Sequence, residues 1–379
     1  MWHSRPRLCS QVKNRGHPAG DWDFTAASSP NRRGGFSLLE LLVVVAIIGT
    51  LAGFLLPSFQ GARAQARAAA CATRIRAICH GMSYYAQEYD DWIVGSPVTS
   101  GSYFFFENRA PSDETVTGWC AQPWDWTGPV ARMLKIPFPQ KNVKDLFNAQ
   151  RSNKHFKCPA NRIVSPAWTG SSIDAGPGPM VSYNTVETFM YASHRTRLQF
   201  RRPVPHREEG GGLTTMPINW AERLPDYYFP RLKYVGNPSW KVFVADGSRF
   251  SNLTARSDYD LSRYARFGGA YSDTGPYGDW TKGWNRAAAF PDQTWIPKVA
   301  GPYDGRLAAF RHGNGKDHGP LGLFKLQMGF FDGHTEIMTD ATSPNPHLWL
   351  PTGSTVNIGH QWVYPDVQQR YGRTRITIR

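Results

Sequence analysis

The sequence lacks the short motifs that accompany several large classes of enzyme. It contains no nucleophile elbow, no phosphate-binding loop, no dinucleotide-binding fingerprint and no internal repeat. It also lacks a Cys-x-x-Cys pair, which argues against a zinc site. No nucleic-acid-binding motif is present either. From these absences we expect a protein that is not an enzyme, with no catalytic residues and no resident metal or cofactor.

Acidic residues are scarce relative to basic ones. The 379 residues include 43 Lys and Arg against 29 Asp and Glu, which gives a formal net charge of +14 at pH 7. The first 35 residues carry +4 of this charge and the remainder carries +10. A basic surface attracts polyanions such as anionic lipid, acidic polysaccharide or nucleic acid. Because no nucleic-acid motif accompanies the charge, we expect no specific nucleic-acid partner.

Charge is almost missing from residues 36–59. Glu40 is the only ionisable side chain there, and the other residues are apolar, small or neutral. A helix of this length spans about 36 Å at about 1.5 Å per residue, which exceeds a hydrocarbon core of about 30 Å. We therefore expect a transmembrane helix over residues 36–59. A charge within such a segment is costly, so Glu40 requires a specific role.

A short motif stands immediately before and at the start of this segment. It reads Arg32-Arg33-Gly34-Gly35-Phe36-Ser37-Leu38-Leu39-Glu40. The motif resembles the prepilin-type signal of type IV pilins and type II secretion pseudopilins. In that family a prepilin peptidase cleaves after the glycine, the new N-terminal Phe is methylated, and the fifth mature residue is Glu. The resemblance implies cleavage between Gly35 and Phe36, and an assembly role in which the Glu40 carboxylate neutralises the Phe36 ammonium of a neighbouring subunit.

Two other interpretations of the N-terminus stay open. An ordinary secretory signal needs a small-x-small cleavage site after the apolar run, which residues 62–64 (Ala-Arg-Ala) supply, although the run is long for such a signal. An unprocessed membrane anchor is the second. Basic residues flank the run on both sides, so charge alone does not fix its orientation. The resemblance implies a single-pass inner-membrane protein with a cytoplasmic N-terminus before processing and a periplasmic or cell-surface globular domain.

Beyond the apolar run the pattern becomes amphipathic. Apolar residues recur at spacings of three and four, which places them on one face of a helix. They are Cys71, Ile75, Ile78, Met82, Tyr85 and Tyr89. We expect one helix from about residue 37 to residue 90, with this stripe docked on a sheet of the same chain. The expected organisation is a leader at 1–35, a long helix at 36–92 and a β-rich globular domain at 93–379.

The remainder of the chain shows little helical periodicity. Short β-type runs stand between turn signals, as expected of antiparallel strands joined by long loops. The runs are 241–245, 325–331, 336–338 and 375–378. Together with the N-terminal helix they predict an α+β fold, pilin-like in architecture, with the long helix packed on an antiparallel sheet.

A second resemblance lies near the C-terminus. Arg311-His312 and the later Phe330-Phe331-Asp332-Gly333-His334-Thr335-Glu336 resemble a C-terminal module of prepilin-like proteins that is named H-X9-DG, for a His, nine residues and Asp-Gly. Here 19 residues separate His312 from Asp332, and 13 separate His318 from it. The spacing departs from the name, which suggests an insertion after His312. Asp332-Gly333 between two β runs predicts a tight hairpin turn.

The cysteines left after the leader form an even set of four, which allows three disulfide connectivities. They are Cys71, Cys79, Cys120 and Cys158. We favour Cys71–Cys158, which would tie the helix to the globular domain, with Cys79–Cys120 second and free buried thiols as the alternative.

Two further sets of ligand-type residues do not match a known metal motif. The first set is His312, His318, Asp332 and His334. The second set is Asp246, Asp258, Asp260, Asp273 and Asp279, which supply enough oxygens for calcium, so a calcium site stays open as the alternative to no cofactor.

These observations predict a structural subunit. The resemblance implies a pilin-like or pseudopilin protein of a type II secretion or type IV pilus-like filament, with prepilin peptidase, other subunits and the inner membrane as partners. A globular part of about 290 residues suggests a minor subunit. The alternative is a membrane-tethered surface protein that binds glycans or other polyanions and uses the prepilin route only for export.

The motif makes a direct prediction about processing. Mass spectrometry of the mature protein should find N-methylated Phe36 as its first residue. Gly35→Ala should abolish cleavage, because a side chain there crowds the peptidase site, and the full leader should then stay attached. A mature protein that begins near Ala64 would instead identify an ordinary secretory signal.

Overall fold

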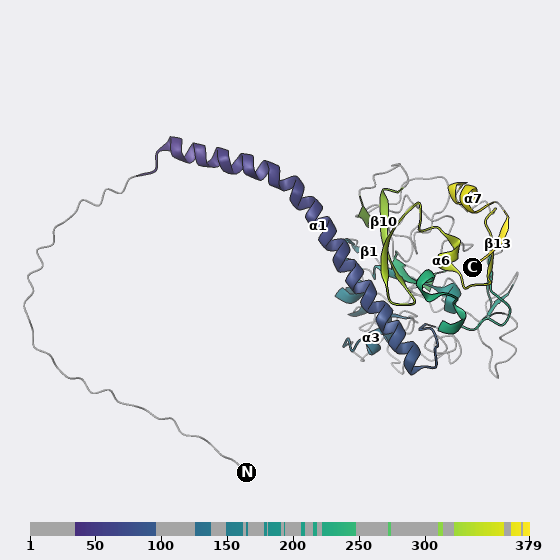
Figure 1. The fold of residues 1–379 in the computed structure, drawn as a ribbon. Coiled ribbons are helices and arrows are strands. Elements are labelled where there is room, and N and C mark those ends of the chain that lie inside the picture. The colour runs from purple at the N-terminus through teal and green to yellow at the C-terminus, as the bar shows by residue number, and fades with distance from the viewer. Residues whose placement is uncertain are drawn as a thin grey trace, which may run out of the picture. The chain divides into compact units, whose positions relative to one another are not determined.

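The computed structural model describes the chain in several segments. They are residues 35–95, 126–137, 149–161, 164–165, 178–179, 181–190, 193, 206–208, 215–217, 222–247, 272–273, 310–313, 322–359, 365–372 and 374–379. The chain divides into two compact units, Met1–Leu56 and Pro57–Arg379. The boundary lies inside the longest helix, so this helix contributes to both units (Figure 1).

The longest helix, α1, runs from Leu38 to Glu88. A capping box begins it, since the Ser37 hydroxyl accepts a hydrogen bond from the Glu40 N–H at 3.2 Å and Glu40 Oε2 accepts one from the Ser37 N–H at 2.9 Å. At its other end, Asp90 and Asp91 take positive φ angles, and the Asp91 N–H bonds back to the carbonyl of Ala86. The predicted helix from residue 37 to residue 90 is confirmed.

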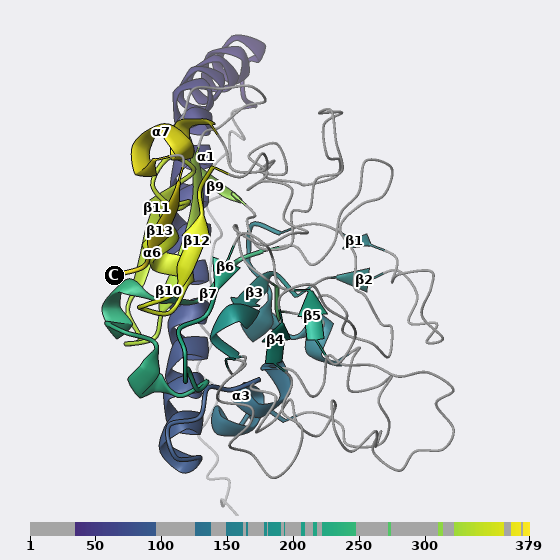
Figure 2. The same cartoon turned by 90° about the vertical axis from the view of Figure 1, so that its right-hand side faces the viewer.

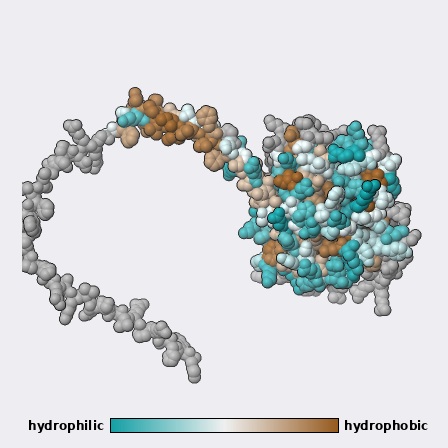
Figure 3. All heavy atoms as spheres, viewed as in Figure 1, coloured by the Kyte–Doolittle hydropathy of each residue, from teal (hydrophilic) through white to brown (hydrophobic). Residues whose placement is uncertain are grey.

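The part of α1 that belongs to the first unit is apolar and fully exposed. An 18-residue window has a mean hydropathy of 2.5, and none of that window is buried. In Figure 3 the hydrophobic atoms gather continuously along it. By length and composition it is able to cross a membrane.

The part of α1 in the second unit carries the predicted apolar stripe. Cys71, Ile75, Ile78 and Met82 have no exposed surface, and Tyr85 is nearly buried. Tyr89 is partly buried and stacks on Tyr85. The stripe packs into the main hydrophobic core of this unit, which confirms that it docks on the globular domain.

The core is built around a six-stranded sheet (Figure 2). Its strands lie in the order β11 (Thr335–Thr339), β10 (Phe324–Phe330), β7 (Val242–Asp246), β3 (Tyr183–Val186) and β8 (Ser272–Asp273), and β9 (His312–Gly313) also pairs with β10. The pairings are antiparallel except β3 with β8. Three of the predicted runs correspond to β7, β10 and β11.

The turn between β10 and β11 is the predicted Asp-Gly hairpin turn. Gly333 has φ +93°, which glycine adopts without steric cost. The Gly333 N–H bonds to the carbonyl of Phe330, and the Asp332 carboxylate accepts from the His334 N–H at 3.1 Å. These contacts fix the register in which β10 and β11 pair.

Smaller elements complete the described fold. A second sheet has the order β13 (Arg375–Thr377), β12 (Thr355–Asn357), β6 (Glu222–Arg223), and β13 corresponds to the fourth predicted run. The remaining strands pair as β1 (Val164–Ser165) with β2 (Gly178–Pro179) and β4 (His206–Glu208) with β5 (Thr215–Pro217). The short helices are α3 (Thr127–Met133), α6 (Pro346–Trp349), α7 (Pro365–Tyr371) and the 3₁₀ turns η2 (Lys154–Phe156), η3 (Glu187–Met190), η4 (Leu232–Tyr234) and η5 (Pro238–Trp240).

Gly329 on β10 lies close against α1. A Cβ at this position would lie 2.5 Å from Cys79 Sγ and 2.5 Å from Ile75 Cγ2, closer than packed atoms allow. Gly329→Ala should therefore push α1 off the sheet and lower the free energy of unfolding by about 1–3 kcal/mol. Denaturation of the detergent-solubilised full-length chain, followed by tryptophan fluorescence, measures this change.

Gly61→Ala is the matched control. Gly61 lies on α1 in the same unit, and a Cβ there meets nothing within 4 Å. Alanine at an open helical position should be neutral or stabilise by up to about 1 kcal/mol. Equal effects of the two substitutions would contradict the close contact at Gly329.

Candidate functional site

The residues of the expected processing site lie at the start of α1. Gly35 and Phe36 precede the helix and are exposed, and a Cβ at Gly35 would meet nothing within 4 Å. Glu40 lies in the first turn, also exposed. The structure adds a local role for Glu40 that the sequence analysis did not identify, because its side chain forms half of the capping box with Ser37. Its role between subunits stays a prediction.

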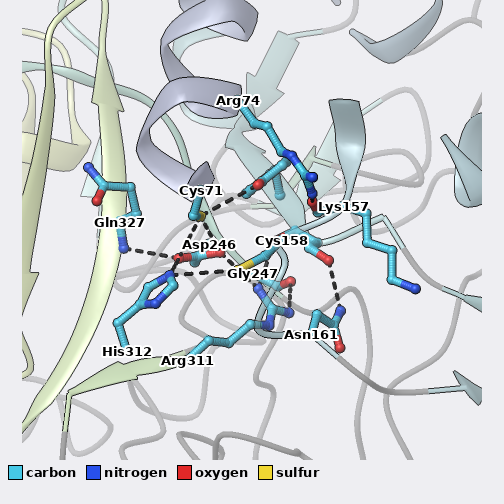
Figure 4. A network of polar contacts seen from close by, with 12 residues as sticks. Cys71, Arg74, Lys157, Cys158, Asn161, Asp246, Gly247, Arg311, His312 and Gln327 are labelled. Atoms are coloured by element: carbon cyan, nitrogen blue, oxygen red, sulfur yellow. Dashed lines mark hydrogen bonds and ion pairs between the residues drawn. The ribbon is translucent and has the colours of Figure 1, made fainter. Parts of the chain in front are cut away.

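A second candidate site lies inside the second unit. Cys71, Cys158, Asp246 and His312, here called the four-residue cluster, each direct one ligand-type atom toward a common point (Figure 4). These atoms all lie within 4.8 Å of one another, and all four residues are buried. Within the described residues this is the one group of three or more potential metal ligands.

The course of the sheet explains how Asp246 and His312 meet. β7 pairs with β10 at Met328–Phe330, and β9 pairs with β10 at Phe324–Lys325. Two strands therefore share one side of β10. Asp246 ends the first of them and His312 begins the second, so both residues lie beside the stretch of β10 between the two pairings. There the backbone N–H of Gln327 donates to Asp246 Oδ2 at 3.0 Å.

The two cysteines come from the helix and from the loop after η2. Cys71 is the first buried residue of the α1 stripe. Arg74, one turn later, donates a hydrogen bond to the carbonyl of Lys157 and so holds the segment that carries Cys158 against α1. A turn fixes that segment, because the Asn161 N–H bonds to the Cys158 carbonyl at 2.9 Å.

Both of these cysteines are free thiols in the structure. The fold brings Cys71 Sγ and Cys158 Sγ within 4.8 Å of each other. A disulfide between them stays a prediction. Cys79 is a third buried free thiol, and its side chain faces β10 near Gly329. Cys120 lies outside the described residues, so the second predicted pairing is untested.

Asp246 is the charge around which the cluster is arranged. Its Oδ1 accepts a hydrogen bond from Arg311 Nη1 at 3.1 Å, and its Oδ2 lies 3.1 Å from His312 Nε2. Arg311 also donates to the carbonyls of Ser182 and Gly247 at 2.8 and 2.6 Å. Burial raises the pKa of Asp246, but the hydrogen bond and charge of His312 and the charge of Arg311 outweigh it, so the pKa stays below its usual value.

The same contacts shift the pKa values of the neighbouring groups. Burial lowers the pKa of His312, but its hydrogen bonds to Asp246 and Cys158 outweigh this and raise it to about 10. Burial raises the pKa of Cys158, while hydrogen bonds from Cys71 and His312 bring it down to about 7. Burial raises the pKa of Cys71 and of Tyr183, whose hydroxyl lies 3.5 Å from Cys71 Sγ. These shifts favour an anionic Asp246 beside a cationic His312 and Arg311.

The arrangement resembles a nucleophile–base–acid triad only in composition. In a working triad the two ring nitrogens of the histidine face different partners. Here the single atom His312 Nε2 lies 3.1 Å from Asp246 and 3.6 Å from Cys158 Sγ, so the ring does not stand between them. Cys158 also has no exposed surface that a substrate reaches. The geometry suits an internal polar network or a cation better than nucleophilic catalysis.

Two other ligand-type residues of the sequence analysis, Asp332 and His334, do not belong to the cluster. Asp332 and His334 pair with each other in the β10–β11 turn, at 2.6 Å between Oδ1 and Nδ1. His318, Asp258, Asp260 and Asp279 lie outside the described residues. Asp246, one of the calcium-type carboxylates, is paired with Arg311 and His312. Arg311 was expected only as part of the C-terminal module and not as the partner of Asp246, although an Asp at the end of the apolar run 242–245 signalled the need for a buried cation.

Comparison with known proteins identifies the N-terminus only. A prokaryotic N-terminal methylation motif matches residues 30–56, which include Gly35, Phe36 and Glu40. No curated protein and no solved structure matches the chain. The motif supports a prepilin-type signal, with processing by prepilin peptidase, export by the prepilin route and membrane attachment through α1.

The buried ion pair makes a prediction about stability. Arg311→Met should lower the free energy of unfolding by about 3–5 kcal/mol, because it removes the arginine charge beside the buried Asp246 carboxylate and the side-chain donor to the carbonyls of Ser182 and Gly247. Chemical denaturation of the full-length protein measures the loss.

Asp90→Asn provides the control for this substitution. Asp90 pairs with Arg231 at 3.0 Å, but its side chain is 79% exposed. Removal of an exposed charge of this kind should cost about 0–1 kcal/mol. A loss from Arg311→Met as small as that from the control would contradict the role assigned to Arg311.

Proposed function

We propose that the chain is a structural, pilin-like subunit of a type IV pilus-like or type II secretion filament, assembled through the first part of α1. The observation that carries the proposal is the methylation motif at residues 30–56, placed on a helix that is exposed and apolar in this part. An exposed apolar helix requires either lipid or other helices around it. Lipid surrounds the helix before assembly, and the helices of other subunits surround it in the filament.

The second part of α1 supports a structural role for the helix. Its stripe is buried in the core from Cys71 to Tyr85, and Arg74 and Arg76 add polar contacts to Lys157 and Thr335. The globular unit therefore includes part of the same helix that carries the signal. Such continuity suits a subunit that displays its globular part on a helical filament core.

The size of the globular part favours a minor subunit. The region after the helix comprises about 290 residues, rich in aromatic side chains and with long segments between strands. A part of this size is more readily accommodated at a filament tip than at every position along a filament. The same size and the basic charge favour the second candidate, a membrane-tethered protein that binds acidic polysaccharide or other polyanions. That candidate shares processing at Gly35 but does not need Glu40 for its activity.

The capping box provides a clean test of the role of Glu40. Glu40→Gln keeps a capping side chain at this position but removes the charge, whereas Ser37→Ala removes the cap but keeps the charge. We expect Glu40→Gln and Glu40→Val to insert in the membrane and be processed, yet to be at least tenfold depleted from sheared filaments. Ser37→Ala should assemble nearly as well as the parent protein. Immunoblots of membrane and filament fractions measure both distributions.

Two outcomes would count against the proposal. Normal assembly of Glu40→Gln together with failure of Ser37→Ala would assign Glu40 to helix capping rather than to a charge pair between subunits. Absence of the parent protein from every filament fraction, with full retention in the membrane, would favour the tethered binding protein.

A further inference from the structure

The four-residue cluster joins four separate parts of the second unit at one buried point. We propose that it is a structural zinc site, with Cys71 Sγ, Cys158 Sγ, His312 Nε2 and Asp246 Oδ2 as its ligands. The ligands come from α1, the loop after η2, the end of β7 and β9. The proposal does not depend on filament assembly, because every ligand belongs to the globular unit.

Two distances between ligand atoms match the edges of a zinc tetrahedron, and a third is close to one. With Zn–S of about 2.3 Å and Zn–N or Zn–O of about 2.0–2.2 Å, such a tetrahedron has edges of about 3.5–3.6 Å from S to N or O and about 3.3–3.5 Å from N to O. The structure places Cys158 Sγ 3.6 Å from His312 Nε2, and Cys71 Sγ 3.5 Å from Asp246 Oδ2. His312 Nε2 lies 3.1 Å from Asp246 Oδ2. A shift of a few tenths of an ångström brings this last edge to its tetrahedral length, and all four ligand atoms lie within 4.8 Å of one another.

The way the donor atoms converge also favours a central cation. One atom, His312 Nε2, faces both Asp246 and Cys158, and one atom, Cys71 Sγ, faces both carboxylate oxygens of Asp246 and the Tyr183 hydroxyl. A nitrogen that carries a single proton donates well to one acceptor only. A metal ion at the common point satisfies all four atoms at once.

With zinc bound, the formal charges of the site sum to zero. Two thiolates and one carboxylate surround a divalent cation with a net charge of −1, and the Arg311 guanidinium next to Asp246 brings the total to zero. A buried site with no net charge avoids the penalty of an uncompensated charge in the core. The mixed sulfur, nitrogen and oxygen set is one that zinc accepts, whereas calcium and magnesium prefer oxygen alone.

Outer contacts already hold the ligands in orientation. Arg311 occupies Asp246 Oδ1 at 3.1 Å and the Gln327 N–H lies 3.0 Å from Oδ2, so the carboxylate cannot rotate freely. The Tyr183 hydroxyl is 3.5 Å from Cys71 Sγ and is able to donate to a thiolate. Such outer partners typically change metal affinity about 10–100-fold when removed.

The site has four protein ligands and no exposed thiol, which is the pattern of a structural rather than a catalytic zinc. The sequence analysis argued against zinc because no Cys-x-x-Cys is present. The four ligands are instead separated by at least 66 positions, so only the fold brings them together. Metal bound here would link α1 to the sheet and stabilise the folded unit.

The test uses the full-length protein purified in detergent without added chelator. Elemental analysis should find about one zinc per chain, and zinc should be lost in Cys71→Ser, Cys158→Ser and His312→Ala. Cys79→Ser is the matched control and should keep its zinc, since Cys79 is a buried cysteine on the same helix that lies outside the cluster. Tyr183→Phe should keep the site but weaken zinc affinity by about tenfold or more, measured by competition with a chromophoric chelator.

A second measurement covers variants that fail to fold. The parent protein, stripped of metal and titrated with cobalt(II), should develop thiolate-to-cobalt charge-transfer absorption and the intense visible bands of a tetrahedral site at one equivalent. Zinc should then displace the cobalt and abolish these bands. The proposal is overturned if the folded, thiol-reduced parent protein takes up neither metal, or if zinc content is unchanged in all three ligand variants. Recovery of a Cys71–Cys158 disulfide from the native protein would overturn it as well.

Discussion

The carboxylate of Asp246 is a full negative charge with no exposed surface, and much of the globular unit is arranged to neutralise it. A charge in this environment is tolerated only with close partners and satisfied hydrogen bonds. Arg311 and His312 supply the opposite charge from consecutive positions, and Gln327 supplies a backbone donor. Because β7 and β9 share one side of β10, these groups meet at one place. Arg311 also bonds to the carbonyls of Ser182 and Gly247, so the same contacts hold the ends of β3 and β7 together.

The helix α1 meets these groups at Cys71, whose Sγ contacts the Asp246 carboxylate. From Cys71 onward the stripe is buried, whereas the preceding part of the helix is exposed. Gly329 lets Ile75 and Cys79 approach β10 closely, and the Arg74 side chain secures the loop that carries Cys158. The helix is therefore a core element of the globular unit as well as the carrier of the methylation motif.

Local patterns made much of the fold predictable. The three-and-four spacing from Cys71 to Tyr85 identified the buried face of α1, and Asp332-Gly333 identified the hairpin turn, because both signals act over a few residues. The Ser37–Glu40 capping box was equally readable, but the resemblance to pilins accounted for Glu40 first. The short strands β3 and β9 carry too few residues to show alternation. Gly329 looked like an ordinary strand residue in the sequence. The need for glycine there comes from contact with α1, about 250 positions away.

The candidate site shows the same limit more clearly. Sequence reasoning paired Cys71 with Cys158 from burial and chain topology, but it assigned Asp246 to a loose calcium set and His312 to a C-terminal module. Asp246 and His312 come together through the order and register of β7, β9 and β10, and the spacing of residues along the sequence does not reveal either. Arg311 was likewise assigned only to the C-terminal module, because its buried acidic partner Asp246 lies 65 positions away in the sequence.

The central claim is that the second part of α1 and the β10 sheet form one cooperative core. Native-state hydrogen exchange of the full-length protein tests it most directly. We predict that the amides from Ile75 to Tyr85 exchange with the same opening free energy as those of β7 and β10, and that this free energy falls in parallel for all three segments in Arg311→Met. Faster exchange of the helix at unchanged protection of the two strands would show that α1 opens independently, and would contradict the account.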